Sequence, residues 1–114
     1  MGEAADLAPD HIAAFNEAVA RGDFAAFLAR FADDAVMRFD NVPGVGVMEF
    51  AGRAAFTSAY ERNPPDDQMD VDGPVREEGG DVVIPFAWRR DGATGVLRLT
   101  ASGGLIARMV VSFD

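Results

Sequence analysis

Residues 20–36 read ARGDFAAFLARFADDAV, and this stretch predicts how the first elements of the chain follow one another. Gly22 is of the residue type that commonly ends a helix, because glycine adopts the left-handed conformation without strain. Asp23 is a good N-cap for a second helix over residues 24–31. AVMRF (35–39) then reads as a short strand. The stretch therefore predicts two helices followed by a strand.

The residues before this stretch form the first of these helices. Within PDHIAAFNEAVARG, the apolar residues Ile12, Phe15 and Val19 recur at i, i+3 and i+7, which places them on one face. Residues 1–8 are expected to be a flexible start, ahead of a single domain that spans residues 9–114.

A third helix is expected after the loop NVPGVGVMEFAG (41–52), where proline and glycine disfavour regular structure apart from a short strand pair. GRAAFTSAYER (52–62) carries Phe56 and Tyr60 at i and i+4, so both rings lie on one side of the helix. The two prolines that follow end this helix.

The rest of the sequence is typical of strands joined by tight turns. Asp91-Gly92 is a strong hairpin signal. Ile106 and Met109 differ in parity within one strand, which predicts a β-bulge or burial on both faces. Pro85 inside a strand indicates a bulge or a sheet edge. The predicted strands are residues 69–77, 81–90, 96–101 and 105–113.

This order of elements predicts an α+β domain, in which three helices with one intervening strand precede four antiparallel strands. Helices on one face of a curved sheet enclose a cone that apolar side chains line, and a small hydrophobic molecule fits there. Asp40 follows the apolar residues Val36, Met37 and Phe39. It is either a turn residue that opens a loop or a base at the mouth of an apolar pocket.

The charge balance narrows the possible partners. With 10 basic and 19 acidic residues, the chain has a net charge of −9, and its pI is about 4.4. A nucleic-acid backbone and an anionic membrane surface would both repel it. The N-terminus MGEAADLAPD is acidic and resembles neither a signal peptide nor a membrane span. We therefore expect a cytoplasmic protein, and a bacterial one, because all ten basic residues are arginines, as GC-rich genomes favour.

No cofactor and no metal site is predicted. The chain has no cysteine, which excludes disulfides, thiol nucleophiles and thiolate metal sites. The single histidine, His11, lies ahead of the apolar stripe and is expected on the surface. The acidic pairs Asp33-Asp34, Asp66-Asp67 and Glu77-Glu78 are expected at helix ends and turns, without the spacing of calcium ligands.

The segment ARGDFAAFLARFADDAV resembles the AxGDxxxxxxxxxDDA segment of the ketosteroid isomerase and SnoaL-like proteins, which belong to the nuclear transport factor 2-like superfamily. GRAAFTSAYER (52–62) resembles the family's GREQIxxFY helix. GPVRE (73–77), IPF (84–86) and GLIARM (104–109) are similar to strands of ketosteroid isomerases. The resemblance covers roughly residues 10–113, and the order of these segments is more specific for the fold than for a reaction.

The resemblance implies a cone-shaped nuclear transport factor 2-like (cystatin-like) fold, with three N-terminal helices on a strongly curved antiparallel or mixed β-sheet. It also implies a deep pocket for a small hydrophobic molecule, and a homodimer formed through the sheet. Ketosteroid isomerases move a proton between carbons without a cofactor, using an Asp base. A Tyr and a protonated Asp stabilise the enolate oxygen in that reaction.

These catalytic roles match the sequence only in part. The position of the base corresponds to Phe39, so Asp40 takes this role only if a bulge turns it into the cone. The oxyanion Tyr and Asp positions correspond to Phe15 and Val96, which carry no hydrogen-bond donor. The candidate catalytic residues are therefore Asp40 as base and Tyr60 as donor, the alternative for Tyr60 being a core aromatic.

The resemblance also predicts the residues of the pocket and the orientation of two arginines. Arg90 and Arg98 are expected on the solvent or dimer face, although either one would pair with Asp40 or an acidic ligand if it pointed inward. The predicted substrate-binding residues are Phe15, Val19, Phe39, Phe56, Ile84, Phe86, Trp88, Val96, Met109 and Phe113.

Three functions remain open on the sequence alone. The first is cofactor-free isomerisation of a small hydrophobic carbonyl compound, with Asp40 as the base. The second is a non-catalytic ligand-binding or dimerisation domain of the same fold. The third is a polyketide cyclase or a limonene epoxide hydrolase-like hydrolase, since Arg38 and Asp40 are similar to an Arg-x-Asp pair of that branch. A carboxyl group of Asp40 inside the cavity, with a raised pKa, would favour catalysis.

Overall fold

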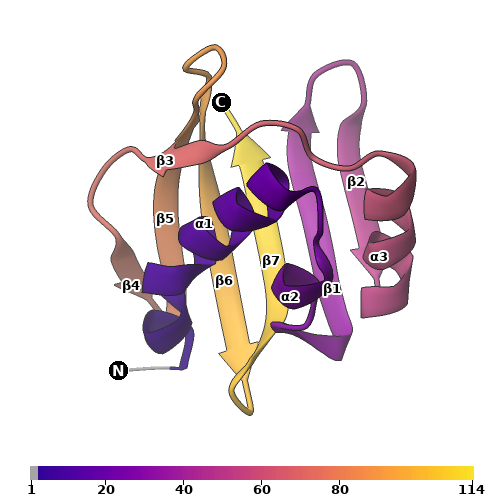
Figure 1. Ribbon diagram of the computed structural model, residues 1–114. Helices are drawn as coiled ribbons and strands as arrows, with labels where there is room; N and C mark the ends of the chain where they lie inside the picture. The colour runs from indigo at the N-terminus through magenta and orange to yellow at the C-terminus, as the bar shows by residue number, and fades with distance from the viewer. Residues whose placement is uncertain (1–2) are drawn as a thin grey trace.

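The computed structural model describes the backbone of residues 3–114 and the side chains of residues 10–114. In this part of the chain, three helices cover one face of a seven-stranded sheet (Figure 1). The helices are α1 (Glu3–Arg21), α2 (Ala25–Leu28) and α3 (Arg53–Arg62). The strands are β1 (Phe31–Val42), β2 (Gly46–Ala51), β3 (Met69–Val71), β4 (Arg76–Glu78), β5 (Asp81–Trp88), β6 (Thr94–Ser102) and β7 (Leu105–Phe113).

The sheet is mixed and open. Its strand order is β2-β1-β7-β6-β5-β3, and β4 also pairs with β5. β1 runs parallel to β7, whereas all other pairs are antiparallel. α1 lies across β5, β6 and β7, while α3 contacts β1 and β2 (Figure 1). This curved sheet under a helical layer confirms the predicted α+β cone fold.

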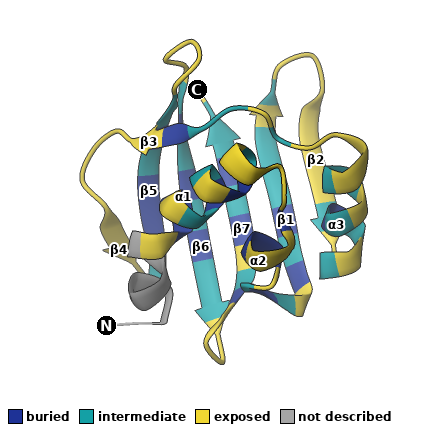
Figure 2. Ribbon diagram, viewed as in Figure 1, coloured by how far each residue is buried: buried dark blue, intermediate teal, exposed yellow. Residues whose placement is uncertain are grey.

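The hydrophobic core lies between the two layers, and the buried residues of β1, β5, β6 and β7 lie in the part of the sheet behind the helices (Figure 2). Phe31 and Phe56 are fully buried, and Phe27 is 2% exposed. The rings of Phe27 and Phe31 are 5.5 Å apart, and those of Phe31 and Phe56 are 5.1 Å apart, both at edge-to-face angles. Burial of each of these rings stabilises the fold by about 1.5–3 kcal/mol.

The second helix is shorter than predicted. α2 ends at Leu28, and Phe31 already belongs to β1, so Asp33 and Asp34 are exposed strand residues rather than the end of a helix. The backbone N–H of Ile106 donates to the Arg30 carbonyl at 2.9 Å, next to the parallel pairing of β1 with β7. Pairing with a distant strand therefore overrides the local helical pattern.

Two further boundaries differ from the sequence prediction. α1 begins at Glu3, so it includes most of the segment predicted to be a flexible start, because Glu, Ala and Leu in that segment favour helix; residues 1–2 lie outside the described residues. β2 occupies part of the predicted loop and forms a sheet edge against β1. Within the described residues, no helix combines the length and the apolar character needed to cross a membrane.

Two irregularities predicted from the sequence are present in the sheet. Ala107 is an extra residue in β7, because Ile106 pairs with Ala101 and Arg108 with Thr100. Pro85 lies in β5 at the gap between the segments that pair with β3 and with β4. The predicted strand 69–77 is interrupted at this gap, so the missing N–H of proline costs no ladder hydrogen bond there.

A β-bulge in β1 decides which of its side chains face the helices. β1 pairs regularly with β2 as far as Phe39, and the register shifts before pairing resumes at Val42. β1 therefore has one residue more than β2 between these two pairs, in the segment Asp40–Asn41. Asn41 has a positive φ of 59°. Phe39 and Val42 consequently both face the helical layer, although they are three residues apart.

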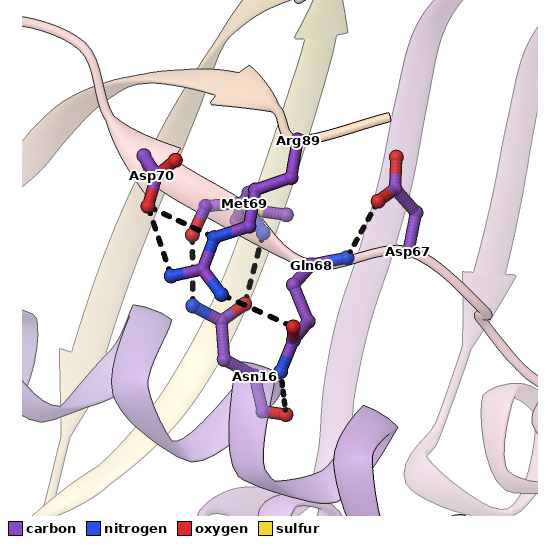
Figure 3. Close-up of polar contacts among 6 residues, drawn as sticks. All are labelled: Asn16, Asp67, Gln68, Met69, Asp70 and Arg89. Atoms are coloured by element: carbon purple, nitrogen blue, oxygen red, sulfur yellow. Dashed lines mark hydrogen bonds and ion pairs between the residues drawn. The ribbon is translucent and has the colours of Figure 1, made fainter. Parts of the chain in front are cut away.

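Asn16 of α1 clamps the edge strand β3 (Figure 3). Its Nδ2 donates to the Met69 carbonyl at 2.8 Å, and its Oδ1 accepts from the Met69 N–H at 2.9 Å. Gln68 Nε2 donates to the Asn16 carbonyl at 2.9 Å, and Arg89 donates to Gln68 Oε1 at 3.1 Å and to the Asp70 carboxylate. The clamp holds β3 and the segment before it against the first helix.

Candidate functional site

A cavity of about 260 Å³ lies between the helices and the sheet. All three helices and six of the strands contribute to its wall, as does the segment that joins α3 to β3. The lining residues are His11, Ile12, Phe15, Phe27, Phe39, Val42, Met48, Phe50, Ala59, Tyr60, Asn63, Pro65, Met69, Trp88, Leu97, Met109, Val111 and Phe113.

The wall of this cavity is apolar and carries no acidic side chain, lysine or arginine among the described residues. The polar groups that it contains are the imidazole of His11, the hydroxyl of Tyr60, the amide of Asn63 and the indole N–H of Trp88. An ionised ligand would lose its hydration here without gaining an opposite charge, which costs several kcal/mol. The cavity is therefore suited to an uncharged apolar molecule.

Aromatic rings form one continuous wall. The ring of Phe15 lies 5.6 Å from that of Phe27 and 6.2 Å from that of Trp88, in both cases edge to face. The ring of Phe27 is stacked against that of Tyr60, with the centroids 6.4 Å apart. These contacts fix the rings, so the cavity is held open by packing rather than by polar bonds.

Asp40 is not among the residues that line the cavity, so the bulge does not turn it into the cone, as its role as a base would require. The Asp40 carboxylate accepts a hydrogen bond from Arg38 Nε at 2.7 Å, and Arg38 also lies 3.8 Å from Glu49. The side chain of Asp40 is 33% exposed. Phe39 enters the cavity instead, because the bulge follows Phe39 and turns Val42, not Asp40, toward the helices.

Tyr60 lines the cavity from α3. Its ring packs edge to face on Phe24 at 5.3 Å. Burial raises the pKa of Tyr60, so its hydroxyl stays protonated across the physiological range. No hydrogen bond to this hydroxyl is found within the part of the chain that the structure describes. The hydroxyl is therefore free to donate to an oxygen of a bound molecule.

His11 also lines the cavity, and the prediction that it lies on the surface is wrong. Its exposed fraction is 1%. It precedes Phe15 by four residues, so both side chains lie on the same face of α1. Its ring centroid is 5.3 Å from that of Phe27 and 6.3 Å from that of Phe31. Burial, together with the positive charge of Arg30, lowers the pKa of His11 to about 3.

The other residues predicted from the resemblance divide into two groups. Phe15, Phe39, Trp88, Met109 and Phe113 line the cavity. The remaining five do not, because each faces another part of the molecule. Phe56, Ile84 and Phe86 are buried inside the core, Val19 packs on the edge of that core, and Val96 lies on the outer face of β6, where Leu97 takes the inward position.

The two arginines left open by the sequence both lie away from the cavity. Arg98 donates to the carboxylates of Asp81 at 2.9 Å and of Glu78 at 2.6 Å, on the outer face of the sheet. Arg90 is exposed and donates to the Asp66 carbonyl at 3.0 Å. Among the described residues, no group of three or more His, Cys, Asp or Glu side chains is placed to hold a metal ion.

Several lining residues carried no recognisable signal in the sequence. Val42 and Met48 belong to the segment predicted as a loop, and they line the cavity because β2 and the bulge place them there. Met69 begins a short edge strand whose position depends on Asn16. His11 was the exception, since its spacing of four from Phe15 was a usable signal.

Comparison with solved structures shows the same fold in proteins of low sequence identity. A Bacillus subtilis protein assigned as an isomerase superposes with a TM-score of 0.74 at 16% identity, over 100% of this chain and 90% of that one. A Kribbella flavida protein assigned as a ketosteroid isomerase superposes with a TM-score of 0.68 at 22% identity, over 98% of this chain and 78% of that one. A Burkholderia xenovorans NTF-2 like protein of unknown function superposes with a TM-score of 0.69 at 20% identity, over 99% of this chain and 87% of that one.

A comparison with curated proteins found no match. The family model described as SnoaL-like domain matches residues 12–109, which is most of the chain and includes β1 to β6 and the first part of β7. The cone fold and its apolar cavity are consistent with this match. The chain therefore belongs to the SnoaL-like domain family, and it shares its fold with the NTF2-like and ketosteroid isomerase-like structures described above.

Proposed function

We propose that this protein binds a small, uncharged, apolar molecule in the cone, as a ligand-binding member of its family. One observation carries the proposal: the cavity of about 260 Å³ is bounded by apolar and aromatic side chains, with no ionised group among the described lining residues. Burial of such a ligand removes apolar surface from water at about 25 cal/mol for each Å². The stacked aromatic wall keeps the binding site largely preformed.

The same cavity offers little for acid–base catalysis. A general base must reach the proton that it removes, and the Asp40 carboxylate pairs with Arg38 outside the lining. His11, with a pKa of about 3, is a weak base at neutral pH. The pKa of Tyr60 is raised, so its hydroxyl is a weak acid as well. Retention of a ligand is thus better supported than its conversion.

A fluorescence titration tests the proposed binding. Trp88 is the single tryptophan of the chain and lies in the cavity wall, so its emission reports occupancy. We expect saturable binding of indane and at least tenfold weaker binding of indane-2-carboxylate, because the carboxylate loses its hydration. Equal affinities for the two probes would contradict an uncharged binding site.

Two alanine variants on α3 provide a matched pair for this titration. Ala59→Phe fills the cavity and should abolish indane binding, since Ala59 is a lining residue. Ala54→Phe adds the same ring to an exposed position of the same helix and should leave binding unchanged. Binding that survives Ala59→Phe would place the probe elsewhere.

The competing isomerase function has its own test. Proton exchange into a model enone in D₂O would be compared for the native protein and Asp40→Asn. We expect both proteins to show only the background rate, because Asp40 lies outside the cavity. Exchange above background that Asp40→Asn abolishes would establish Asp40 as a base and overturn the binding-only proposal.

A further inference from the structure

His11 is a buried polar side chain without a hydrogen-bond partner. Its exposed fraction is 1%, and its Nδ1 is enclosed without a hydrogen-bond partner. No hydrogen bond to this side chain is found anywhere in the described part of the chain. Nearly all buried polar groups in proteins have a partner, so one that lacks a partner requires an explanation. A buried polar group without a partner lowers the free energy of unfolding by about 1–3 kcal/mol.

The position of His11 supplies the explanation. The side chain belongs to the wall of the cavity, together with Phe15 and Phe27, and its ring contacts that of Phe27. If His11 only filled space in this aromatic wall, a phenylalanine would fill the same space and leave no polar atom unpaired. The imidazole can turn about its Cβ–Cγ bond, which would exchange the places of Nδ1 and Cδ2 without changing the ring volume. Because His11 lines the cavity, its ring nitrogens are candidates for contact with a molecule there.

We propose that His11 is a ligand-contacting residue, which forms a hydrogen bond with a hydroxyl or carbonyl oxygen on the bound apolar molecule. This inference rests on the proposed binding function and sharpens its ligand class, from any apolar molecule to one with an oxygen placed against the imidazole. Because the low pKa of His11 leaves the imidazole neutral, it offers one donor and one acceptor. A neutral oxygen group suits it, and an ionised group gains no charge partner.

Tyr60, Asn63 and Trp88 are the other polar residues of the wall, and the hydroxyl of Tyr60 is the strongest competitor for the oxygen. The rings of His11 and Tyr60 both contact that of Phe27, whose centroid is 5.3 Å from that of His11 and 6.4 Å from that of Tyr60, whereas no direct ring contact joins His11 to Tyr60 among the described residues. The single oxygen of a small rigid ligand is therefore expected to meet one group or the other. The inference assigns it to His11, which is the more deeply buried of the two and loses more when left unpaired.

The test compares indane with indan-2-ol and indan-2-one, in the native protein and in His11→Phe, His11→Gln and Tyr60→Phe. These probes share one ring system and differ only in the oxygen. For each protein, the affinity of each oxygenated probe is divided by the affinity of indane, and the native protein gives the reference ratio. We expect His11→Phe to lower this ratio about tenfold while indane binding is kept, because the ligand oxygen becomes an unpaired buried group. His11→Gln, which keeps a donor and an acceptor, should restore part of the ratio.

The outcomes are distinguishable. A loss for both oxygenated probes means that His11 donates to the oxygen, and a loss for indan-2-ol alone means that it accepts the hydroxyl proton; both support the inference. An unchanged ratio in His11→Phe, an equal loss for all three probes, or a loss in Tyr60→Phe alone would overturn it. Failure of indane itself to bind the native protein would instead refute the proposed function on which the inference rests.

Discussion

At the scale of the single residue, Asn41 decides which side chains of β1 enter the cavity. Its φ of 59° creates the bulge after Phe39, and its Nδ2 donates to the Phe113 carbonyl at 2.8 Å. Asparagine tolerates this left-handed conformation better than most residues do. The bulge places Phe39 and Val42 in the cavity wall and leaves Asp40 outside it.

Substitution of Asn41 is predicted to show this conformational requirement. Asn41→Val should lower the free energy of unfolding by about 1–2 kcal/mol more than Asn41→Gly, because a β-branched residue is strained at positive φ. Both variants lose the bond to Phe113, so their difference isolates the backbone effect. Urea denaturation measures it. Equal stabilities of the two variants would mean that the bulge does not depend on the left-handed conformation.

His11 is predicted to make stability depend on pH. Its pKa is about 3 in the folded protein and about 6.5 in the unfolded chain. Between these values the unfolded chain binds a proton that the folded protein does not. The free energy of unfolding therefore falls as the pH drops from 6.5 toward 3, by up to about 1.4 kcal/mol per pH unit from this residue.

His11→Phe is the control for this pH dependence. The many carboxylates titrate in both proteins, so only the difference between the two denaturation curves reports His11. We expect the native protein to lose stability relative to His11→Phe as the pH falls from 6.5 to 4. Parallel curves over this range would show that the imidazole is not held neutral by burial.

At the scale of the element, a single side chain of α1 bonds to the backbone of the edge strand β3, which otherwise pairs with β5. Asn16→Ala removes both hydrogen bonds to Met69 and leaves its N–H and carbonyl without partners. We predict a loss of about 1–3 kcal/mol in the free energy of unfolding and faster hydrogen exchange at Met69. Exchange at Leu97, on the central strand β6, should change only in proportion to the global loss of stability. Unchanged exchange at Met69 would contradict the clamp.

The elements that local patterns specify were predicted correctly from the sequence. The helical stripe of Phe15, the hairpin at Asp91-Gly92 and the bulge between Ile106 and Met109 each depend on neighbouring residues, and each is present. The start of β1 at Phe31 was not predicted, because its strand conformation depends on pairing with β7, far along the chain. β2 was expected only as part of a short strand pair, because the proline and glycine residues of this segment favour a loop.

The candidate site was predictable only where the local face of an element was clear. Phe15, Trp88 and Met109 were predicted as pocket residues and lie in the cavity wall. Val96 was assigned to the wrong face of β6, since strand parity is uncertain without knowing the register. Asp40 lies outside the cavity because of a bulge in β1, and the sequence alone did not predict the position of this bulge. The roles of the wall residues in binding stay predictions until a ligand is measured.

At the scale of the whole molecule, the homodimer implied by the family resemblance stays a prediction. The outer face of β1, β7 and β6 combines partly buried valines with charged residues of both signs, among them Arg38 and Arg98. A stable dimer through this face would bury about 800 Å² on each partner. Light scattering after size exclusion should give twice the chain mass of 12.1 kDa, whereas a monomer mass at high micromolar concentration would contradict it.

The central claim is that an apolar ligand occupies the cavity, and methionine methyl NMR tests it most directly. Met48, Met69 and Met109 line the cavity, whereas Met37 is fully buried in the core outside it and serves as an internal control. Titration with indane should shift the methyl resonances of the three lining methionines and leave that of Met37 in place. No shift at saturating indane, or an equal shift of Met37, would contradict the assignment of this cavity as the binding site.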